Sequence, residues 1–383
     1  MCCVPLAFAP VFRSEVPMGE HRWSDAAAVV ALAGLPKMGP RRLRNLLSDR
    51  TPIEAVEWVG AGGLPDGVPA PLGAAWRAGL HCFDPDAART QLRESGTEAT
   101  WSALPTHPTF LADDVAPAPV LFRRGRPIDE AAPAVAIVGT RRASGTGREI
   151  ARELGLGLAE AGVTVVSGLA LGIDGAAHEG ALLADAAPPV AFVGGGTDVV
   201  YPKRHLGLWG RMVDAGTVAG EAPPAAPPAP WRFPARNRLI AAAADIVVVV
   251  ESRAAGGSLL TVDEAIRRDR QVMAVPGSLR NPAAAGTNSL LADGCAPVLA
   301  VDDVLTALGL SQVERETRRD RIEVPPAPSA AAARVLSACD DGPASIDRLS
   351  ARSGLAVGEV LAAVSELLVA GAVVDDGARV RRA

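Results

Sequence analysis

Short runs of valine and isoleucine alternate with stretches of helical spacing through the middle of the chain. These runs are continuous in apolar residues, which is typical of strands covered on both faces. Five of them predict strands, at Val135–Val138, Val163–Val166, Val190–Val193, Ile246–Val250 and Val272–Val275. Four stretches predict helices, at Thr146–Ala161, Ile173–Ala184, Arg236–Ala243 and Leu259–Arg268. Repeated strand–helix units predict an α/β fold built on a doubly wound parallel sheet.

The pattern before this region is helical. Over residues 24–95, Ala, Val and Leu follow helical spacing that Gly and Pro interrupt. Residues 35–44 predict a helix end, a Gly-Pro turn and a second helix with proline at its start. This is the shape of a helix–hairpin–helix, whose turn can present Lys37, Gly39 and Arg41 to a phosphate. A plain helical hairpin in a small bundle is an equally good interpretation.

A stiff linker and a small domain follow the central region. Proline dominates residues 325–328, which predicts an extended, exposed linker. Ala331–Ala338, Ile346–Ser353 and Val357–Ala370 predict three helices, and residues 373–380 predict two short strands around an Asp-Gly turn. Three helices followed by two strands indicate a winged helix. A three-helix bundle with a frayed tail is the alternative.

A chain of 383 residues is too long for one ordinary domain. Its apolar first residues lack a basic segment and make a poor signal peptide, and the natural start could be Met1 or Met18. We expect a poorly ordered tail over 1–23, a helical domain of the SAM or helix–hairpin–helix kind over 24–105, the α/β domain over 106–312, a linker over 313–329 and the winged helix over 330–383.

Composition and charge exclude several classes of protein. With 49% hydrophobic and 21% charged residues the chain is globular, and no apolar run reaches the roughly 18 residues of a membrane span. The five cysteines lack the spacing of a metal site or a disulfide framework, so we expect reduced thiols, no metal and a cytoplasmic protein. A net charge of −5 argues against a nucleic-acid partner, although it averages over domains.

The candidate chemistry follows the predicted strands. The first strand runs into a glycine-rich turn, Gly139–Gly147, that opens a helix. Free N–H groups and the helix dipole make such a turn an anion site. It lacks the G-x-G-x-x-G order and the ribose-binding acid of a dinucleotide site, so we expect no cofactor. Arg141 instead offers a guanidinium that can grip a phosphate with two hydrogen bonds.

Later strands also end in small residues. The second ends in Ser167-Gly168, and the third ends in three glycines before Tyr201-Pro202-Lys203. Ligands of doubly wound sheets bind at the carboxyl ends of the strands, near the point where the strand order reverses. Several such loops along one edge would form a groove longer than a mononucleotide pocket.

The ordered set of motifs resembles one family, the DNA-processing protein A family (DprA, also called Smf). The matching blocks lie, in order, at residues 139–147, 167–178, 194–203, 233–238, 257–261 and 274–277. The resemblance covers about residues 110–300. It implies an extended Rossmann-like domain that binds single-stranded DNA rather than a nucleotide cofactor. It also implies a homodimer that loads the recombinase RecA onto incoming strands in natural transformation.

By motif position, the resemblance assigns Arg141 and Lys203 to the DNA backbone. The full set of candidate nucleic-acid contacts is Gly139, Arg141, Arg142, Ser144, Gly147, Ser167, Gly168, Lys203, Arg236, Asn237, Arg238, Gly257 and Ser258, with Lys37, Gly39 and Arg41 as hairpin contacts. Aromatic residues are few, and Tyr201 and Phe233 are the candidates for stacking on bases.

Two other functional classes are weighed against this one. The same loops fit a nucleotide or phosphoribosyl hydrolase on a related fold. The acids near the edge, however, are Asp174, Asp198 and Glu251, which helix-capping or strand-end roles explain, so we expect no enzyme. A transcription regulator would use the winged helix, but its predicted third helix carries two glutamates and no Arg or Lys. A recognition helix offers basic or amide side chains to base edges.

Overall fold

The structure, a computed structural model, describes residues 22–310, 329–339, 344–369, 372–375 and 380–382. The chain forms two compact units, Met1–Ser311 and Gln312–Ala383. The predicted tail and linker lie outside the described residues, apart from residues 22, 23 and 329. Among the helices that are described, none has the length and apolarity needed to cross a membrane.

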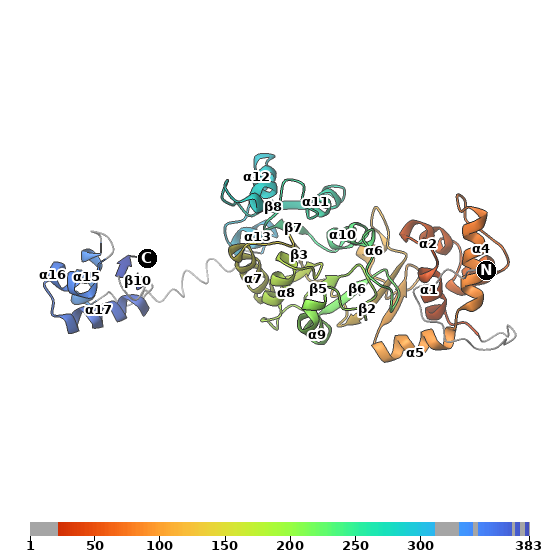
Figure 1. Ribbon diagram of the computed structural model, residues 1–383, viewed down its shortest axis with the longest axis horizontal. Helices are drawn as coiled ribbons and strands as arrows, with labels where there is room; N and C mark the ends of the chain where they lie inside the picture. The colour runs from red at the N-terminus through yellow and green to blue at the C-terminus, as the bar shows by residue number, and fades with distance from the viewer. Residues whose placement is uncertain (1–21, 311–328, 340–343, 370–371, 376–379, 383) are drawn as a thin grey trace. The chain divides into compact units, whose positions relative to one another are not determined.

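A nine-stranded sheet forms the centre of the first unit (Figure 1). Across the sheet lie β1 (Glu98–Trp101), β2 (Val120–Gly125), β6 (Thr217–Gly220), β5 (Val190–Phe192), β4 (Thr164–Ser167), β3 (Ala134–Val138), β7 (Ile246–Val249), β8 (Gln271–Ala274) and β9 (Ala296–Pro297). Every neighbouring pair from β6 to β9 is parallel, whereas β2 is antiparallel to both β1 and β6. The strand order reverses between β3 and β7. The predicted doubly wound parallel sheet is confirmed, with an added antiparallel edge.

Helices cover both faces of the parallel strands (Figure 1). The central unit contains α6 (Thr109–Ala112), α7 (Gly145–Glu160), α8 (Ile173–Ala181), α9 (Leu206–Ala215), α10 (Arg232–Ala242), α11 (Leu259–Ile266), α12 (Ala285–Ala292) and α13 (Val301–Ala307). In β3, Val135 and Ile137 pack in the core shared with α7 and α8. Ala136 and Val138 pack in the opposite core, with α10 and α11. Burial on both faces is the physical reason for the continuous apolar runs.

Several short elements were not predicted. Strands β1, β2, β6 and β9 each contain Glu, Arg, Gly or Pro, which interrupt the apolar run that marks the predicted strands. Strand β1 belongs to the sheet although it lies in the range expected to be helical. Helix α10 begins at Arg232 rather than at the predicted Arg236, which places Arg236 in its second turn.

The helical front consists of α1 (Asp25–Gly34), α2 (Pro40–Leu47), α3 (Pro52–Gly60), α4 (Ala70–Cys82) and α5 (Pro85–Ser95). Its core includes Val120 and Phe122 of β2, so the front helices pack on the antiparallel edge of the sheet. The predicted pair of helices joined by a Gly-Pro turn is present as α1 and α2, which fits both a helix–hairpin–helix and a plain helical hairpin. Fully buried Trp76 donates its indole N–H to the carbonyl of Pro36 at 2.9 Å, which fixes the turn.

The second unit has its own core. Helices α15 (Ala330–Ala338), α16 (Ile346–Ser353) and α17 (Val357–Val369) are followed by the antiparallel pair β10 (Val373–Asp375) and β11 (Val380–Arg382). This is the predicted winged helix, while the predicted Asp-Gly turn lies outside the described residues. Glu366 of α17 accepts hydrogen bonds from the backbone and hydroxyl of Ser329, both at 2.7 Å. This glutamate therefore ties the start of the first helix to the third.

Candidate nucleic-acid interface

The anion site predicted at the start of α7 is occupied by a carboxylate of the protein itself. Glu251, directly after β7, is 6% exposed and accepts hydrogen bonds from the backbone N–H of Ser144 at 2.8 Å and from its hydroxyl at 2.6 Å. Asn281 donates to the same carboxylate at 3.2 Å. Ser144 in turn caps α7 by accepting from Gly147 N. Ser144 therefore already has internal partners for its backbone N–H and its hydroxyl, and its contact with a phosphate stays a prediction.

The glycines of this loop serve close internal packing. A Cβ on Gly139 would lie 2.5 Å from Ile173 Cγ1, and one on Gly147 would lie 2.5 Å from a carboxylate oxygen of Glu251. Both positions therefore need glycine for contacts inside the protein, not for the approach of a ligand. Together with Ser144, they fill the switch point between β3 and β7, where a ligand was expected.

The open space lies instead at the carboxyl ends of β4 and β5. We call it the edge cavity, and it is lined by Arg141, Gly168, Ala170, Leu171, Val193, Gly194, Gly195, Val199, Tyr201, Pro202, Trp209, Phe233 and Arg236. The Arg141 guanidinium lies over the Phe233 ring, 4.9 Å from its centroid. Tyr201 lies beside the same ring with 5.6 Å between centroids. With Trp209 in its lining as well, the cavity therefore combines three aromatic side chains with two guanidinium groups.

Arg236 is the unusual member of this set. Its side chain is buried, with 6% of the residue exposed, and its Nε and Nη1 atoms have no hydrogen-bond partner among the described residues. A Cβ on Gly168 would overlap this guanidinium, which explains the glycine there. Burial lowers the pKa of Arg236 to about 10, while nearby Asp174 opposes the shift. An unpartnered buried cation is costly and suits an anionic ligand.

The other predicted cations lie at the rim or outside the cavity. Arg141, Arg142 and Lys203 are exposed. Lys203 begins the short 3-10 helix Lys203–His205, directly after Pro202 of the cavity lining. Asn237 is half-buried on α10, next to Arg236. Of these predicted cations, Arg141 lines the same cavity as Arg236. Arg142 and Lys203 do not line it, but each follows a lining residue in the sequence.

Three predicted contacts are used inside the fold. Arg238 pairs with Glu221 at 2.5 Å and donates to the carbonyl of Ala116 at 2.7 Å. Fully buried Ser167 donates to the carbonyl of Ile137 at 2.6 Å. Buried Ser258 donates to the Ser252 hydroxyl at 2.9 Å. Each of these side chains therefore already has an internal partner, and its contact with DNA stays a prediction.

Gly257 and the predicted hairpin contacts lie away from the edge cavity. Gly257 is exposed, with open space around its Cα, but it does not line the cavity. Lys37 is exposed, and its carbonyl accepts a hydrogen bond from Arg42 at 2.6 Å. Gly39 is half-buried and lines a different cavity, and Arg41 is exposed on the first turn of α2.

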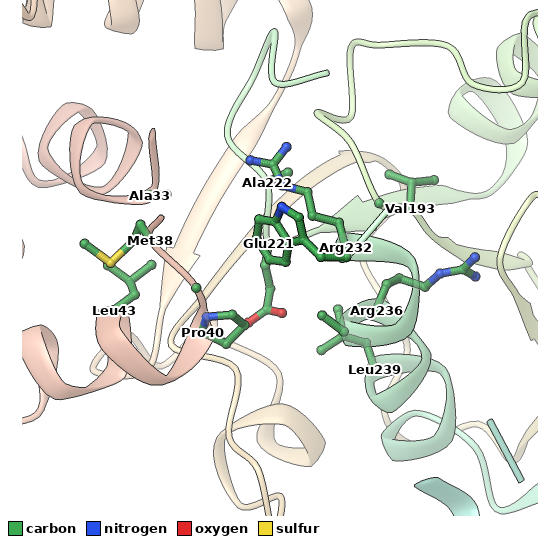
Figure 2. Close-up of a pocket in the computed structure, with 14 residues that line it drawn as sticks. Ala33, Met38, Pro40, Leu43, Val193, Glu221, Ala222, Arg232, Arg236 and Leu239 are labelled. Carbon is green, nitrogen blue, oxygen red and sulfur yellow. The ribbon is translucent and has the colours of Figure 1, made fainter. Parts of the chain in front are cut away.

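Gly39 lines a second cavity, which lies between the hairpin turn and α10. We call it the hairpin cavity; Figure 2 shows Met38, Pro40 and Leu43 on one side and Val193, Arg236 and Leu239 on the other. Val193, Gly194 and Arg236 line both cavities, so the two adjoin. Trp231 is 51% exposed at this cavity, and the sequence analysis missed it because an isolated Trp after a proline-rich loop has no motif.

A buried polar cluster supports Arg236. Asp174 is 6% exposed, and burial raises the pKa of its carboxyl against the opposing charge of Arg236. His178 is fully buried with both ring nitrogens unpartnered among the described residues, and burial lowers its pKa to about 3. His205 Nδ1 lies 3.1 Å from the carbonyl of Leu169. No group of metal-ligating side chains occurs in the described part of the chain.

Comparison with known proteins identifies the family to which this chain belongs. The family model of the DNA recombination-mediator protein A matches residues 99–309, and that of the DprA winged helix domain matches residues 321–377. A putative DNA processing protein DprA of Mycobacterium tuberculosis is 40% identical over 247 residues, which are 64% of this chain and 63% of that protein. The DNA processing protein DprA of Bacillus subtilis is 32% identical, over 56% of this chain and 73% of its own length.

Two solved structures share the fold at 26% identity. DNA processing protein A from Streptococcus pneumoniae has a TM-score of 0.63 and covers 74% of this chain and 98% of its own. The Helicobacter pylori protein, whose structure is described by its single-stranded DNA binding mode, has a TM-score of 0.50 and covers 56% of this chain and 97% of its own. The chain spans less than two thirds of the Mycobacterium relative. The family model, however, matches more than half of this chain, which therefore belongs to the DNA recombination-mediator protein A family.

Proposed function

We propose that this chain is a non-catalytic mediator of recombination that binds single-stranded DNA at the edge cavity. It acts in the cytoplasm as a homodimer and loads RecA onto incoming strands during natural transformation. Family membership supports the recombination role. The ligand is supported by the Helicobacter pylori relative, whose structure is described with single-stranded DNA.

The observation that carries this proposal is the environment of Arg236. Its buried Nε and Nη1 atoms lack partners in the described protein, and the exposed guanidinium of Arg141 lines the same cavity. A phosphate can accept hydrogen bonds from both groups and neutralise the buried charge. Phe233 and Tyr201 offer ring faces to neighbouring bases. Phosphate contacts and stacking do not depend on base identity, so we expect weak sequence preference.

The test replaces the two predicted backbone contacts together, as Arg141→Ala with Lys203→Ala. We expect binding of oligothymidylate to be lost in a mobility-shift assay, while circular dichroism shows an intact fold. The matched control, Arg77→Ala with Arg211→Ala, removes the same charge from α4 and α9 and should bind normally. Binding by the first variant as tight as wild type would contradict the site.

The role in RecA loading has its own measurement. RecA filament nucleation on single-stranded DNA coated with single-strand-binding protein should accelerate with wild type and not with the Arg141→Ala, Lys203→Ala variant. Affinity should fall steeply with salt, since each phosphate contact releases counterions. Double-stranded DNA should compete poorly because its bases are unavailable for stacking. Sedimentation of the full chain tests the dimer.

A hydrolase is the second candidate, since burial raises the pKa of Asp174 beside a ligand cavity. We nevertheless propose no catalysis, because the acids near the edge have internal roles. Asp198 accepts from Ala225 N at 2.8 Å, and Glu251 holds the first loop. Asp174 offsets the charge of Arg236. Release of free base from nucleoside monophosphates by purified protein would contradict this proposal.

A further inference from the structure

A cluster of arginines lies on the front helices, away from the edge cavity. Arg41, Arg42 and Arg44 of α2 line one hollow together with Asn45 and the loop at Asp66. We call it the arginine hollow. The opposite face of α2, with Leu43, Leu46 and Leu47, is buried in the front core. The amphipathic pattern of the helix therefore directs its charged side chains outward.

These three guanidinium groups have few internal partners. None of them forms an ion pair in the described part of the chain, although Asp66 lines the same hollow. Arg42 donates to the Lys37 carbonyl at 2.6 Å, and Arg44 reaches the carbonyl of Pro117 only at 3.5 Å. Arg41 is exposed. The charge of Arg44 also acts on buried Glu221, where it opposes the rise of the pKa caused by burial. Three neighbouring cations without an ion pair among the described residues still form a local positive field suited to a polyanion.

The hairpin cavity lies between the edge cavity and the start of α2, the helix that carries the three arginines. It shares Val193, Gly194 and Arg236 with the edge cavity, and its other wall is the start of α2 at Gly39 and Pro40 (Figure 2). The next residues of α2, Arg41 and Arg42, line the arginine hollow. The edge cavity and the hairpin cavity therefore adjoin, and the arginine hollow begins at the next residue of α2, although no residue lines both the hairpin cavity and the hollow.

An exposed aromatic ring lies along this path. Trp231 lines the hairpin cavity and is 51% exposed, and the Arg232 guanidinium lies over its ring at 5.2 Å from the centroid. An exposed indole beside a cation is the arrangement on which an unpaired base stacks while its phosphate meets a positive charge. Trp231 thus offers a base platform between the two groups of arginines.

We propose that single-stranded DNA continues from the edge cavity past Trp231 to the arginine hollow, where Arg41 and Arg44 hold its phosphates. This inference rests on the proposed function and extends it to the front helices. The strand is favoured over an acidic protein segment because the hollow is joined to a phosphate site by a path with an aromatic platform. Longer strands should therefore bind more tightly than strands that fill the edge cavity alone.

The test compares two labelled oligothymidylates, of about 5 and about 20 nucleotides; the first lies near the lower end of the site sizes of single-strand-binding domains and the second exceeds their upper end. The variant of the full chain is Arg41→Gln with Arg44→Gln; Arg42 stays because it supports the Lys37 carbonyl. We expect the long strand to bind about tenfold more weakly, and the slope of log affinity against log salt to fall by about 0.7 per lost contact. The short strand should bind as it does to wild type, which also shows that the fold is intact.

Two further variants complete the design. Trp231→Leu should weaken the long strand about tenfold by loss of stacking and leave the short strand unchanged. The control Arg77→Gln with Arg211→Gln removes equal charge and should change neither. If the long strand binds the Arg41→Gln, Arg44→Gln variant as tightly as wild type, with an unchanged salt slope, the inference is wrong. An acidic protein then becomes the better occupant of the arginine hollow. If wild type binds neither strand, or the short strand ignores Arg141→Ala, the proposed function fails instead.

Discussion

Arg236 and Arg238 lie two residues apart on α10 and have different surroundings. Successive helical residues rotate by about 100°, so side chains two apart point in nearly opposite directions. Arg236 lines both cavities without a hydrogen bond to its Nε or Nη1 among the described residues. Arg238 is paired with Glu221. The sequence could show that the two differ in direction, but it could not show which one faces the ligand.

The first prediction uses this pair. Arg236→Met should weaken single-stranded DNA binding at least about tenfold. It should also lower the free energy of unfolding by about 1–3 kcal/mol, because it removes two unpartnered nitrogens but leaves Asp174 buried without its opposing charge. Arg238→Met should cost about 3 kcal/mol by leaving Glu221 unpaired in the interior, with little effect on DNA affinity of the folded protein. Urea unfolding and anisotropy titration measure the two effects. Equal losses of affinity in both variants would contradict the assignment.

The second prediction concerns His178. Its folded pKa of about 3 lies below the unfolded value near 6.5, because burial disfavours the charged ring. The stabilisation from the neutral ring is fully present above pH 6.5 and is lost as the pH falls toward 3. Glu221 has the opposite effect on stability, because burial raises its pKa to about 7. Its contribution to the free energy of unfolding therefore weakens as the pH rises toward 7.

The effect of His178 is therefore measured as a difference. We expect the free energy of unfolding of wild type to fall relative to His178→Leu by about 1.4 kcal/mol per pH unit below pH 6. Glu221 is present in both proteins, so its contribution cancels. A difference that stays constant between pH 7 and pH 4 would show that His178 is not held neutral by the fold.

At the level of elements, the sequence predicted the central strands well and the sheet edge poorly. Residues 135–138 and 246–250 are apolar because both faces are covered, and they stand out in the sequence. Strand β1 pairs with β2, which follows after residues 102–119, and only one of the four side chains of β1 is buried. Such half-covered strands of a few residues resemble loops until their partner is known.

Sequence prediction of the candidate nucleic-acid interface was limited in the same way by contacts between distant residues. The glycine-rich turn before α7 predicted an anion, which is correct in physical terms, but the anion is Glu251 from a loop more than 100 residues away. Long-range pairing of this kind leaves no local signal. The order of motifs identified the edge of the sheet, whereas the choice among its side chains required coordinates.

The third prediction tests the packing of α7 on α8. A Cβ on Gly155 would overlap the backbone carbonyl of Ala177, so Gly155→Ala should cost about 1–3 kcal/mol by forcing the helices apart. Gly210 of α9 has open space around its Cα, and Gly210→Ala should stabilise by about 1 kcal/mol through helix propensity. Chemical denaturation compares the two. A stabilised Gly155→Ala would show that α7 and α8 are not in close contact.

For the molecule as a whole, net charge was a misleading guide. The chain carries −5 overall, yet Arg141 and Arg236 line the edge cavity and three arginines line the hollow on α2. Binding of a polyanion depends on the potential where it lies, within about one Debye length of 8–10 Å, rather than on the sum over the surface. An acidic average with local basic sites is consistent with the proposed function, in which the protein must also release its DNA.

The last prediction separates the two units. All residues of the edge cavity, the hairpin cavity and the arginine hollow belong to the unit Met1–Ser311, which has its own cores. A chain ended at Ser311 should therefore bind a long oligothymidylate within about twofold of the full chain, with the same salt slope, because no phosphate contact is removed. The third helix of the winged domain, α17, uses Glu366 to hold Ser329 and exposes Leu361 and Leu368, which favours a protein partner over DNA. A truncated chain with a clearly smaller salt slope would instead place the winged helix on the DNA backbone, and the phosphates would then have to be shared between the two units.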